Sequence, residues 1–148
     1  MHFAIFIINS HGSLVYDNTA LSDKIKIKSN DALRLAGTFH TMHSISSQIT
    51  PESAEEEKFI AGTHLRDGIQ TIESDSFKLH CYQVLTGIKF LLVSDVSTPE
   101  TEMHHMLAEV YQIYGDFVSK NPFYEQDMPI RMTKFDKAIE KLFMPSYY

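Results

Sequence analysis

The chain has 148 residues, a length that fits one domain able to build a core without metal ions or disulfide bonds. Hydrophobic residues make up 43% of it and charged residues 22%, which are ordinary values for a globular protein and exclude an intrinsically disordered one. The formal net charge is −6, which argues against nucleic acid as a partner and, more weakly, against direct adhesion to an anionic membrane.

The single cysteine, Cys81, permits no internal disulfide bond, and a reducing compartment is the simplest expectation. The apolar run Phe3–Ile8 is far shorter than a membrane span, and no basic residue precedes it as one would in a signal peptide. We therefore expect a cytoplasmic protein whose membrane association is indirect.

The chain is predicted to begin with a β-hairpin. Phe3–Ile8 is apolar at every position, which is typical of a strand buried on both faces. A polar link that contains Gly12 separates it from a second apolar run, Leu14–Tyr16. The residues from Asp17 to Ser29 are predicted to form a polar loop.

A helix is predicted from Ser29 or Asn30 to Ile49, where Thr50-Pro51 ends it. The acidic stretch at 53–58 is then expected to be a surface loop. Apolar residues at steps of three and four place one helix face inward: Ala32, Leu35, Phe39, Met42, Ser46 and Ile49.

The periodicity then changes to two, which predicts three strands of an antiparallel meander. These strands are Gly68–Ser74, Phe77–Val84 and Gly87–Val93. The whole order becomes β-β-α-β-β-β-α-α once two C-terminal helices are added. We expect an α+β fold in one domain over residues 1–148, with a five-stranded antiparallel sheet flanked by helices on both faces.

The two C-terminal helices carry start and stop signals. Thr98 is predicted to cap the first, with Pro99 in its first position, and this helix stops at Lys120, before Pro122. Its apolar stripe comprises Met103, Met106, Leu107, Val110, Ile113, Tyr114 and Phe117. The second helix is predicted to begin near Pro129 and to align Met132, Phe135, Ile139 and Leu142.

The sequence offers little for catalysis, and we expect no catalytic residue, cofactor or metal. Neither phosphate-binding glycine motif occurs. His40 and His43 lie three residues apart on the predicted first helix, but no third ligand stands beside them at helical spacing. Cys81 follows His80 on a strand, where neighbouring side chains point to opposite faces, so the two cannot form a nucleophile–base pair.

The first helix is our first candidate for a binding surface. Residues 32–49 contain one charge, Arg34, where the chain-wide fraction would give about four. The uncharged outer face favours contact with another protein, although an uncharged face in solvent is the alternative. The candidate residues are Leu33, Gly37, His40, Thr41, Ser44 and Gln48.

The second candidate is the segment from Asn121 to Arg131, which is too apolar for a free loop. Its apolar residues either fold back on the core and order the last two helices, or form a patch for a partner. Two prolines, Pro122 and Pro129, stiffen it. The residues concerned are Phe123, Tyr124, Met128 and Ile130.

Several blocks of the sequence resemble the synbindin-type subunits of the TRAPP vesicle-tethering complex. The most specific are FKLHCYQVLTGIKF (77–90) and KNPFYEQDMPIR (120–131), which related subunits of that complex do not combine. NSHGSLVYD (9–17) and FHTMHSISSQITP (39–51) fit the same family. Animal members carry a PDZ-like insertion after the second strand, and residues 18–29 are too few to hold one.

The resemblance implies a longin fold and a non-catalytic role in TRAPP, on early (cis) Golgi and ER-derived membranes. It implies that the chain pairs with a second small longin subunit. The pair would help to dock the Rab GTPase of ER-to-Golgi traffic for nucleotide exchange. Two alternatives stay open: a longin adaptor or SNARE-regulating protein outside TRAPP, and a stand-alone histidine- or metal-dependent enzyme.

Overall fold

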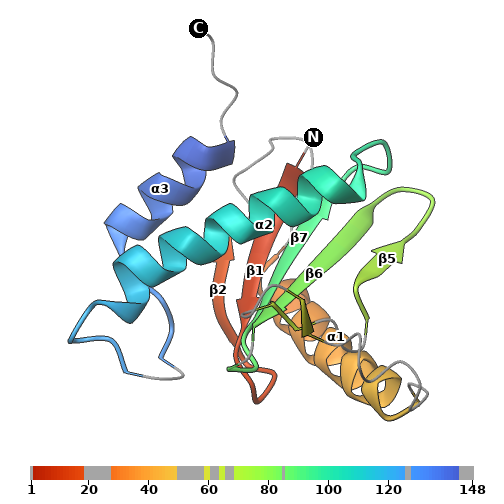
Figure 1. Ribbon diagram of the computed structural model, residues 1–148, viewed down its shortest axis with the longest axis horizontal. Coiled ribbons are helices and arrows are strands. Elements are labelled where there is room, and N and C mark those ends of the chain that lie inside the picture. The colour runs from red at the N-terminus through yellow and green to blue at the C-terminus, as the bar shows by residue number, and fades with distance from the viewer. Residues whose placement is uncertain are drawn as a thin grey trace, which may run out of the picture.

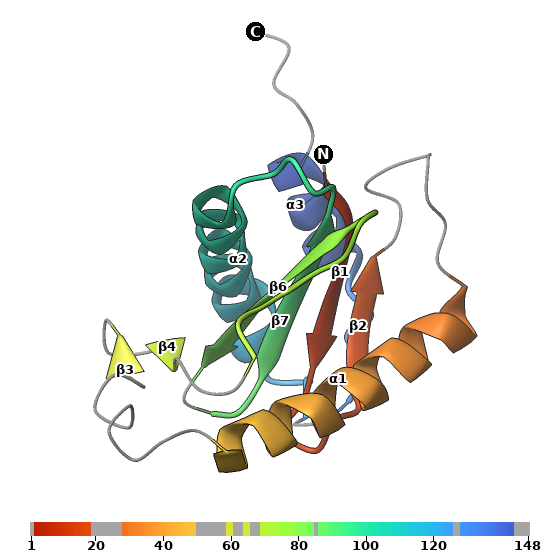
Figure 2. The ribbon, with the colours of Figure 1, turned by 90° about the vertical axis from the view of Figure 1, so that its right-hand side faces the viewer.

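The computed structural model describes residues 2–18, 28–49, 59–60, 64–65, 69–84, 86–125 and 128–143. Figures 1 and 2 show three layers, with one antiparallel sheet between helix α1 on one face and helices α2 and α3 on the other. The α+β arrangement predicted from the sequence is therefore confirmed. The helices are α1 (Ser29–Ile49), α2 (Glu100–Tyr114), a π-helical turn η2 (Gly115–Ser119) and α3 (Thr133–Phe143).

The sheet runs in the order β2-β1-β7-β6-β4-β3, and β5 pairs with β6 beside β4. The first strand pairs with a neighbour on each side, and Ala4 to Ile8 are all buried, as its unbroken apolar pattern predicts. The strands are β1 (His2–Ile8), β2 (Leu14–Asn18), β3 (Phe59–Ile60), β4 (His64–Leu65), β5 (Thr71–Glu73), β6 (Lys78–Val84) and β7 (Lys89–Ser94).

Alternation along the strands produces two cores, one on each face. Ile5, Ile7, Phe90 and Leu92 pack under α2 and α3, where Tyr16 meets Phe135 edge-on with ring centroids 4.8 Å apart. The α1 core contains the other strand residues together with helix residues: Ala4, Phe6, Ile8, Ala32, Ala36, Phe39, Leu79, Cys81, Leu91 and Val93. Both faces of the sheet are thus buried.

The inward face of α1 is rotated from the one predicted. The prediction was wrong for Met42 and Ile49, which are exposed, whereas His43 is buried. Small residues Ala32 and Ala36 let the helix approach the sheet closely, and this contact, rather than the larger side chains, sets which face points inward. The predicted bounds of the helix are confirmed.

The apolar stripe predicted for α2 is confirmed as far as Tyr114, and beyond that residue a different position points inward. The turn η2 winds more loosely than an α-helix, and the extra residue brings Val118 into the core. Phe117, predicted to point inward, is exposed for this reason. At the start of α2, Pro99 is the N-cap residue, and Thr98 does not cap the helix because its hydroxyl donates to Asp95 instead.

The last helix begins later than predicted. The amide of Ile130 donates to the carbonyl of Val15 in β2 at 2.7 Å, which holds the backbone extended until Thr133. The short strands β3 and β4 were not predicted, since two residues give no periodicity.

The loop predicted from Asp17 to Ser29 was wrong at its ends, because Asp17 and Asn18 belong to β2 and Ser29 begins α1. Apart from Lys28, the remainder of that loop, at 19–27, and the loop predicted at 53–58 lie outside the described residues.

Candidate partner-binding surfaces

The predicted outer face of α1 is exposed. Leu33, Gly37, Thr41, Ser44 and Gln48 all lie on the solvent side of the helix, and half-buried His40 forms its border with the sheet. Figure 2 shows α1 lying across the sheet with its outer side uncovered by the described elements. The structure therefore brings these six residues together on one surface.

The same helix exposes apolar side chains that the sequence pattern missed. Ile45 is 55% exposed and Ile49 77%, and with Met42 they form a stripe along the C-terminal half of α1. Of the seven exposed large hydrophobic side chains in the described part of the chain, four lie on α1, including Leu33. The sequence contained the information that groups Ile45 with Met42 and Ile49, because residues three and four positions apart lie on the same side of a helix.

One hydroxyl of the outer face is satisfied within the helix, because Thr41 donates to the carbonyl of Gly37 at 3.0 Å. The hydroxyl of half-buried Ser47, one turn after buried His43, likewise donates to the carbonyl of His43 at 3.1 Å. Such hydroxyls are already hydrogen-bonded within their own helix, so covering them costs less than covering a free polar group. At Gly37 a Cβ atom would meet nothing within 4 Å, which leaves the helix backbone open to close approach.

His40 joins α1 to the sheet through a buried lysine. The Lys89 ammonium lies 3.5 Å from Nδ1 of His40, and Lys89 is only 3% exposed. Burial lowers the pKa of Lys89; burial, followed by the charges of Lys89 and His11, lowers the pKa of His40. Gly12, with φ of +88°, packs against the imidazole so closely that a Cβ there would lie 2.6 Å from Cδ2.

The segment after η2 divides into a buried part and an exposed part. Ile130 belongs to the core under α3, as the structural interpretation of this segment requires. Phe123 is 88% exposed, although its amide is held by Asn121 Oδ1 at 3.0 Å. Half-buried Tyr124 donates its hydroxyl to the carbonyl of exposed Met128 at 2.8 Å. The exposed ring of Phe123 is therefore attached to a backbone position that a hydrogen bond holds in place.

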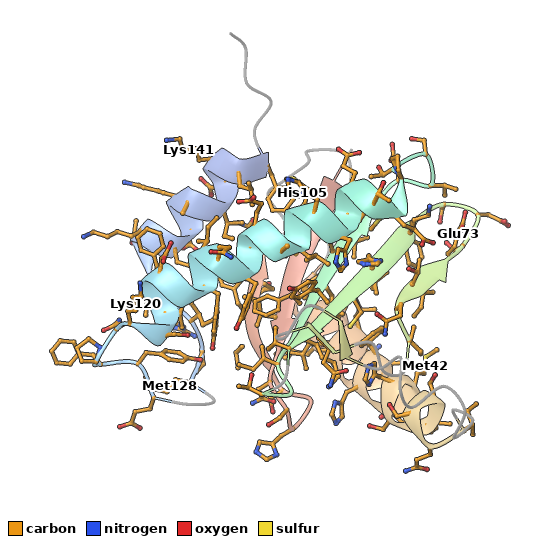
Figure 3. All side chains as sticks on the ribbon, in the orientation of Figure 1. Met42, Glu73, His105, Lys120, Met128 and Lys141 are labelled. Atoms are coloured by element: carbon orange, nitrogen blue, oxygen red, sulfur yellow. The ribbon has the colours of Figure 1, made fainter. Side chains whose placement is uncertain are left out.

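A shallow groove of about 430 Å³ lies beside Phe123. Figure 3 places Met128, at this groove, and Met42, on α1, on opposite sides of the molecule. The two candidate surfaces are therefore separate. The groove is lined by Asn121, Phe123, Tyr124, Met128, Pro129, Arg131 and Met132.

The residues that could have suggested an enzyme lie apart. Cys81 is in the α1 core, where burial raises its pKa to about 12, so little of the reactive thiolate forms near neutral pH. His80 points to the opposite face, as strand alternation predicts, with Nε2 3.4 Å from Nδ1 of His104. Within the described residues, no three His, Cys, Asp or Glu side chains gather as metal ligands would.

Comparison with known proteins then places the chain among its relatives. A model of the family described as sybindin-like matches residues 2–146. The chain belongs to the sybindin-like family. It is 38% identical to trafficking protein particle complex subunit 4 of Dictyostelium discoideum, over 94% of this chain and 93% of that protein.

Two further relatives set the range of similarity. The human protein named trafficking protein particle complex subunit 4 is 41% identical over 78% of this chain, which spans 47% of the human protein's length. Subunit 1 of Dictyostelium discoideum is 24% identical, with 99% of each chain covered. Similarity thus extends beyond subunit 4 to a second subunit bearing the same complex's name.

Among solved structures, a Roadblock/LC7 domain from Streptomyces avermitilis superposes with a TM-score of 0.55 at 11% identity. The match covers 80% of this chain and 87% of that domain. At this identity the likeness concerns the fold alone. None of the helices in the described ranges has the length and apolar character needed to cross a bilayer.

Proposed function

We propose that the chain is a non-catalytic subunit of a trafficking protein particle complex, and that it acts through the outer face of α1. The observation that carries the proposal is the exposed, partly apolar surface of that helix, which over residues 32–49 carries a single charge, Arg34, in a protein of net charge −6. A face intended for water normally carries Lys and Glu. The names of its relatives support membership of the complex.

The partner we propose for this face is a second small longin subunit, with a Rab GTPase of ER-to-Golgi traffic docking on the paired domains. Exchange in such an assembly needs no acid, base or metal from this chain. It needs a surface that holds the nucleotide-free GTPase more tightly than the nucleotide-bound form. We place the assembly on early Golgi and ER-derived membranes, with this chain attached to them through its partners.

The groove beside Phe123 is a candidate for a second contact. Its distance from α1 allows one subunit to touch two neighbours at once (Figure 3). Phe123 is the natural anchor, because an exposed aromatic ring on an ordered loop loses little conformational freedom on binding. A binding role for this loop is compatible with the structural role of Ile130, since the two side chains point to different surroundings.

The test is to place a carboxylate on the α1 face. Tagged wild-type chain and the variants Gly37→Glu and Ile45→Glu are purified from cells, and the subunits that accompany each are identified by mass spectrometry. We expect other trafficking protein particle subunits with the wild type and loss of the α1 partner with both variants. Space around Gly37 accepts the new side chain, so the folded state should persist.

The matched control is Gln112→Glu, which adds the same charge to an exposed position of α2. It should retain every subunit. Melting curves of all three variants should lie within a few degrees of the wild type, because exposed substitutions change stability by about 0.5 kcal/mol or less. Full retention of subunits by Gly37→Glu and Ile45→Glu would show that α1 is not the interface.

A further inference from the structure

The ammonium of Lys89 is buried beneath α1, and none of the described residues supplies an anion to it. Its hydrogen-bond partner among the described residues is Nδ1 of His40, and no carboxylate of those residues forms an ion pair with it. A buried ammonium is normally paired, because removing it from water is costly and an imidazole returns only part of that cost. Within the part of the chain that the structure describes, the positive charge of Lys89 is therefore not neutralised by a carboxylate.

The contact fixes how His40 faces outward. An ammonium group can only donate hydrogen bonds, so Nδ1 accepts, and in the neutral ring the hydrogen is carried by Nε2. The ring is held on its other side by Gly12, which packs against Cδ2. His40 is half-buried at the border of the outer face of α1. It therefore offers a positioned N–H donor with a buried cation behind it.

We propose that the His40–Lys89 pair receives a carboxylate side chain, from Asp or Glu, of the protein that docks on α1, an inference that rests on the proposed function of that helix. The carboxylate accepts a hydrogen bond from the imidazole and compensates the charge of Lys89. Charge complementarity favours this occupant, because residues 32–49 of α1 carry one charge and that charge, on exposed Arg34, is also positive.

A charged contact at the border of a face whose other charge is on Arg34 would fix the register of docking. Apolar stripes such as Met42, Ile45 and Ile49 tolerate sliding, whereas a carboxylate must meet one donor. The pair would therefore select which helix face of a partner binds, and in which orientation, more than it would raise affinity.

The experiment compares two buried lysines. Lys89→Met removes the cation under α1, and His40→Gln removes the positioned imidazole. The control is Lys78→Met: Lys78 is also buried, at the opposite end of the sheet, and its ammonium donates to the carbonyl of Thr98 at 3.2 Å. The affinity of each full chain for the subunit that Gly37→Glu loses is measured at 50 and 300 mM NaCl.

We expect Lys89→Met and His40→Gln to bind on the order of tenfold more weakly at 50 mM salt, as is usual for a lost hydrogen bond to a charged group. Their affinity should also fall less with added salt than that of the wild type. Lys78→Met should match the wild type in both respects. Substituting the partner's Asp and Glu residues one at a time should reveal one whose effect disappears in the Lys89→Met background.

Equal binding and equal salt dependence of Lys89→Met, His40→Gln and wild type would overturn the proposal while leaving the α1 interface intact. If Lys89→Met fails to fold, as its melting curve would show, His40→Gln alone decides between the two results. If Gly37→Glu loses no subunit, the proposed function fails, and the carboxylate site fails with it.

Discussion

The two faces of the sheet differ in how completely the chain covers them. Among the described residues, sixteen form the core under α2 and α3, to which both helices and the Asn121–Arg131 segment contribute. Ten of the described residues form the core under α1, and the helix supplies three of them, two being alanines. Within this part of the chain, large side chains from several elements cover the first face, whereas α1, whose outer side is partly apolar, covers the second.

Lys78 and Lys89, one buried on each face of the sheet, also differ in their hydrogen-bond partners. Lys78, on the α2 face, donates to a backbone carbonyl, a permanent acceptor within the fold. Lys89, on the α1 face, meets the imidazole of His40, a ring that itself borders solvent. The acceptor of Lys78 is thus part of the buried backbone, whereas the partner of Lys89 lies at the surface, within reach of another molecule. The difference teaches that a buried charge held by a surface group is a reason to test the α1 face for a partner.

The largest expected effect tests the difference in core size. Phe135→Ala should destabilise the protein by about 3–5 kcal/mol in urea unfolding, because the fully buried ring is surrounded by the larger core and Tyr16 packs on its edge. Phe39→Ala should cost about 3 kcal/mol, at the lower end of that range, because the described core around Phe39 is smaller. A greater loss for Phe39→Ala would reverse the ranking of the two faces.

The second test compares the buried part of the Asn121–Arg131 segment with its exposed part. Ile130→Ala should lower stability by about 2–4 kcal/mol because a core side chain is removed. Phe123→Ala should change it by about 0.5 kcal/mol or less, because the ring is 88% exposed. Thermal and urea unfolding of both variants provides the measurement. A large loss for Phe123→Ala would mean that its ring supports the core and is not available to a partner.

The third test concerns the thiol in the α1 core. Burial raises the pKa of Cys81 from its ordinary value of 9.0 to about 12, so between these pH values the unfolded thiol ionises while the folded one stays protonated. Unfolding then releases a proton, and stability must fall as pH rises through this window. From pH 7 to pH 10 the wild type should lose about 1 kcal/mol more than Cys81→Ala. Identical losses in the two proteins would place the thiol in contact with water.

Much of the fold could be predicted because it is encoded by local patterns. The apolar run before Asn9 predicted a central strand, and alternation around Cys81 predicted which side chains share a face. Pro51 and the pattern before it gave the extent of α1. These features depend on neighbours within a few positions, which a single sequence contains.

The errors arise where distant residues decide. The rotation of α1 follows from how closely its alanines meet β-strands that are remote in the chain, and the late start of α3 follows from the pairing of Ile130 with Val15. The candidate surface was predicted from missing charges, but the His40–Lys89 contact was not, because it joins residues 49 positions apart. Sequence periodicity relates only residues that are close in the chain, so it cannot predict a contact of this kind.

The hydrogen bond from Ile130 to Val15 has a consequence for assembly. Strand β2 lies at one edge of the sheet, where free backbone groups would invite a strand from another molecule. Ile130 already occupies the carbonyl of Val15, and the adjacent Pro129 has no N–H to offer. A strand from another molecule therefore cannot use the carbonyl of Val15, which hinders edge-to-edge pairing at this point of the border.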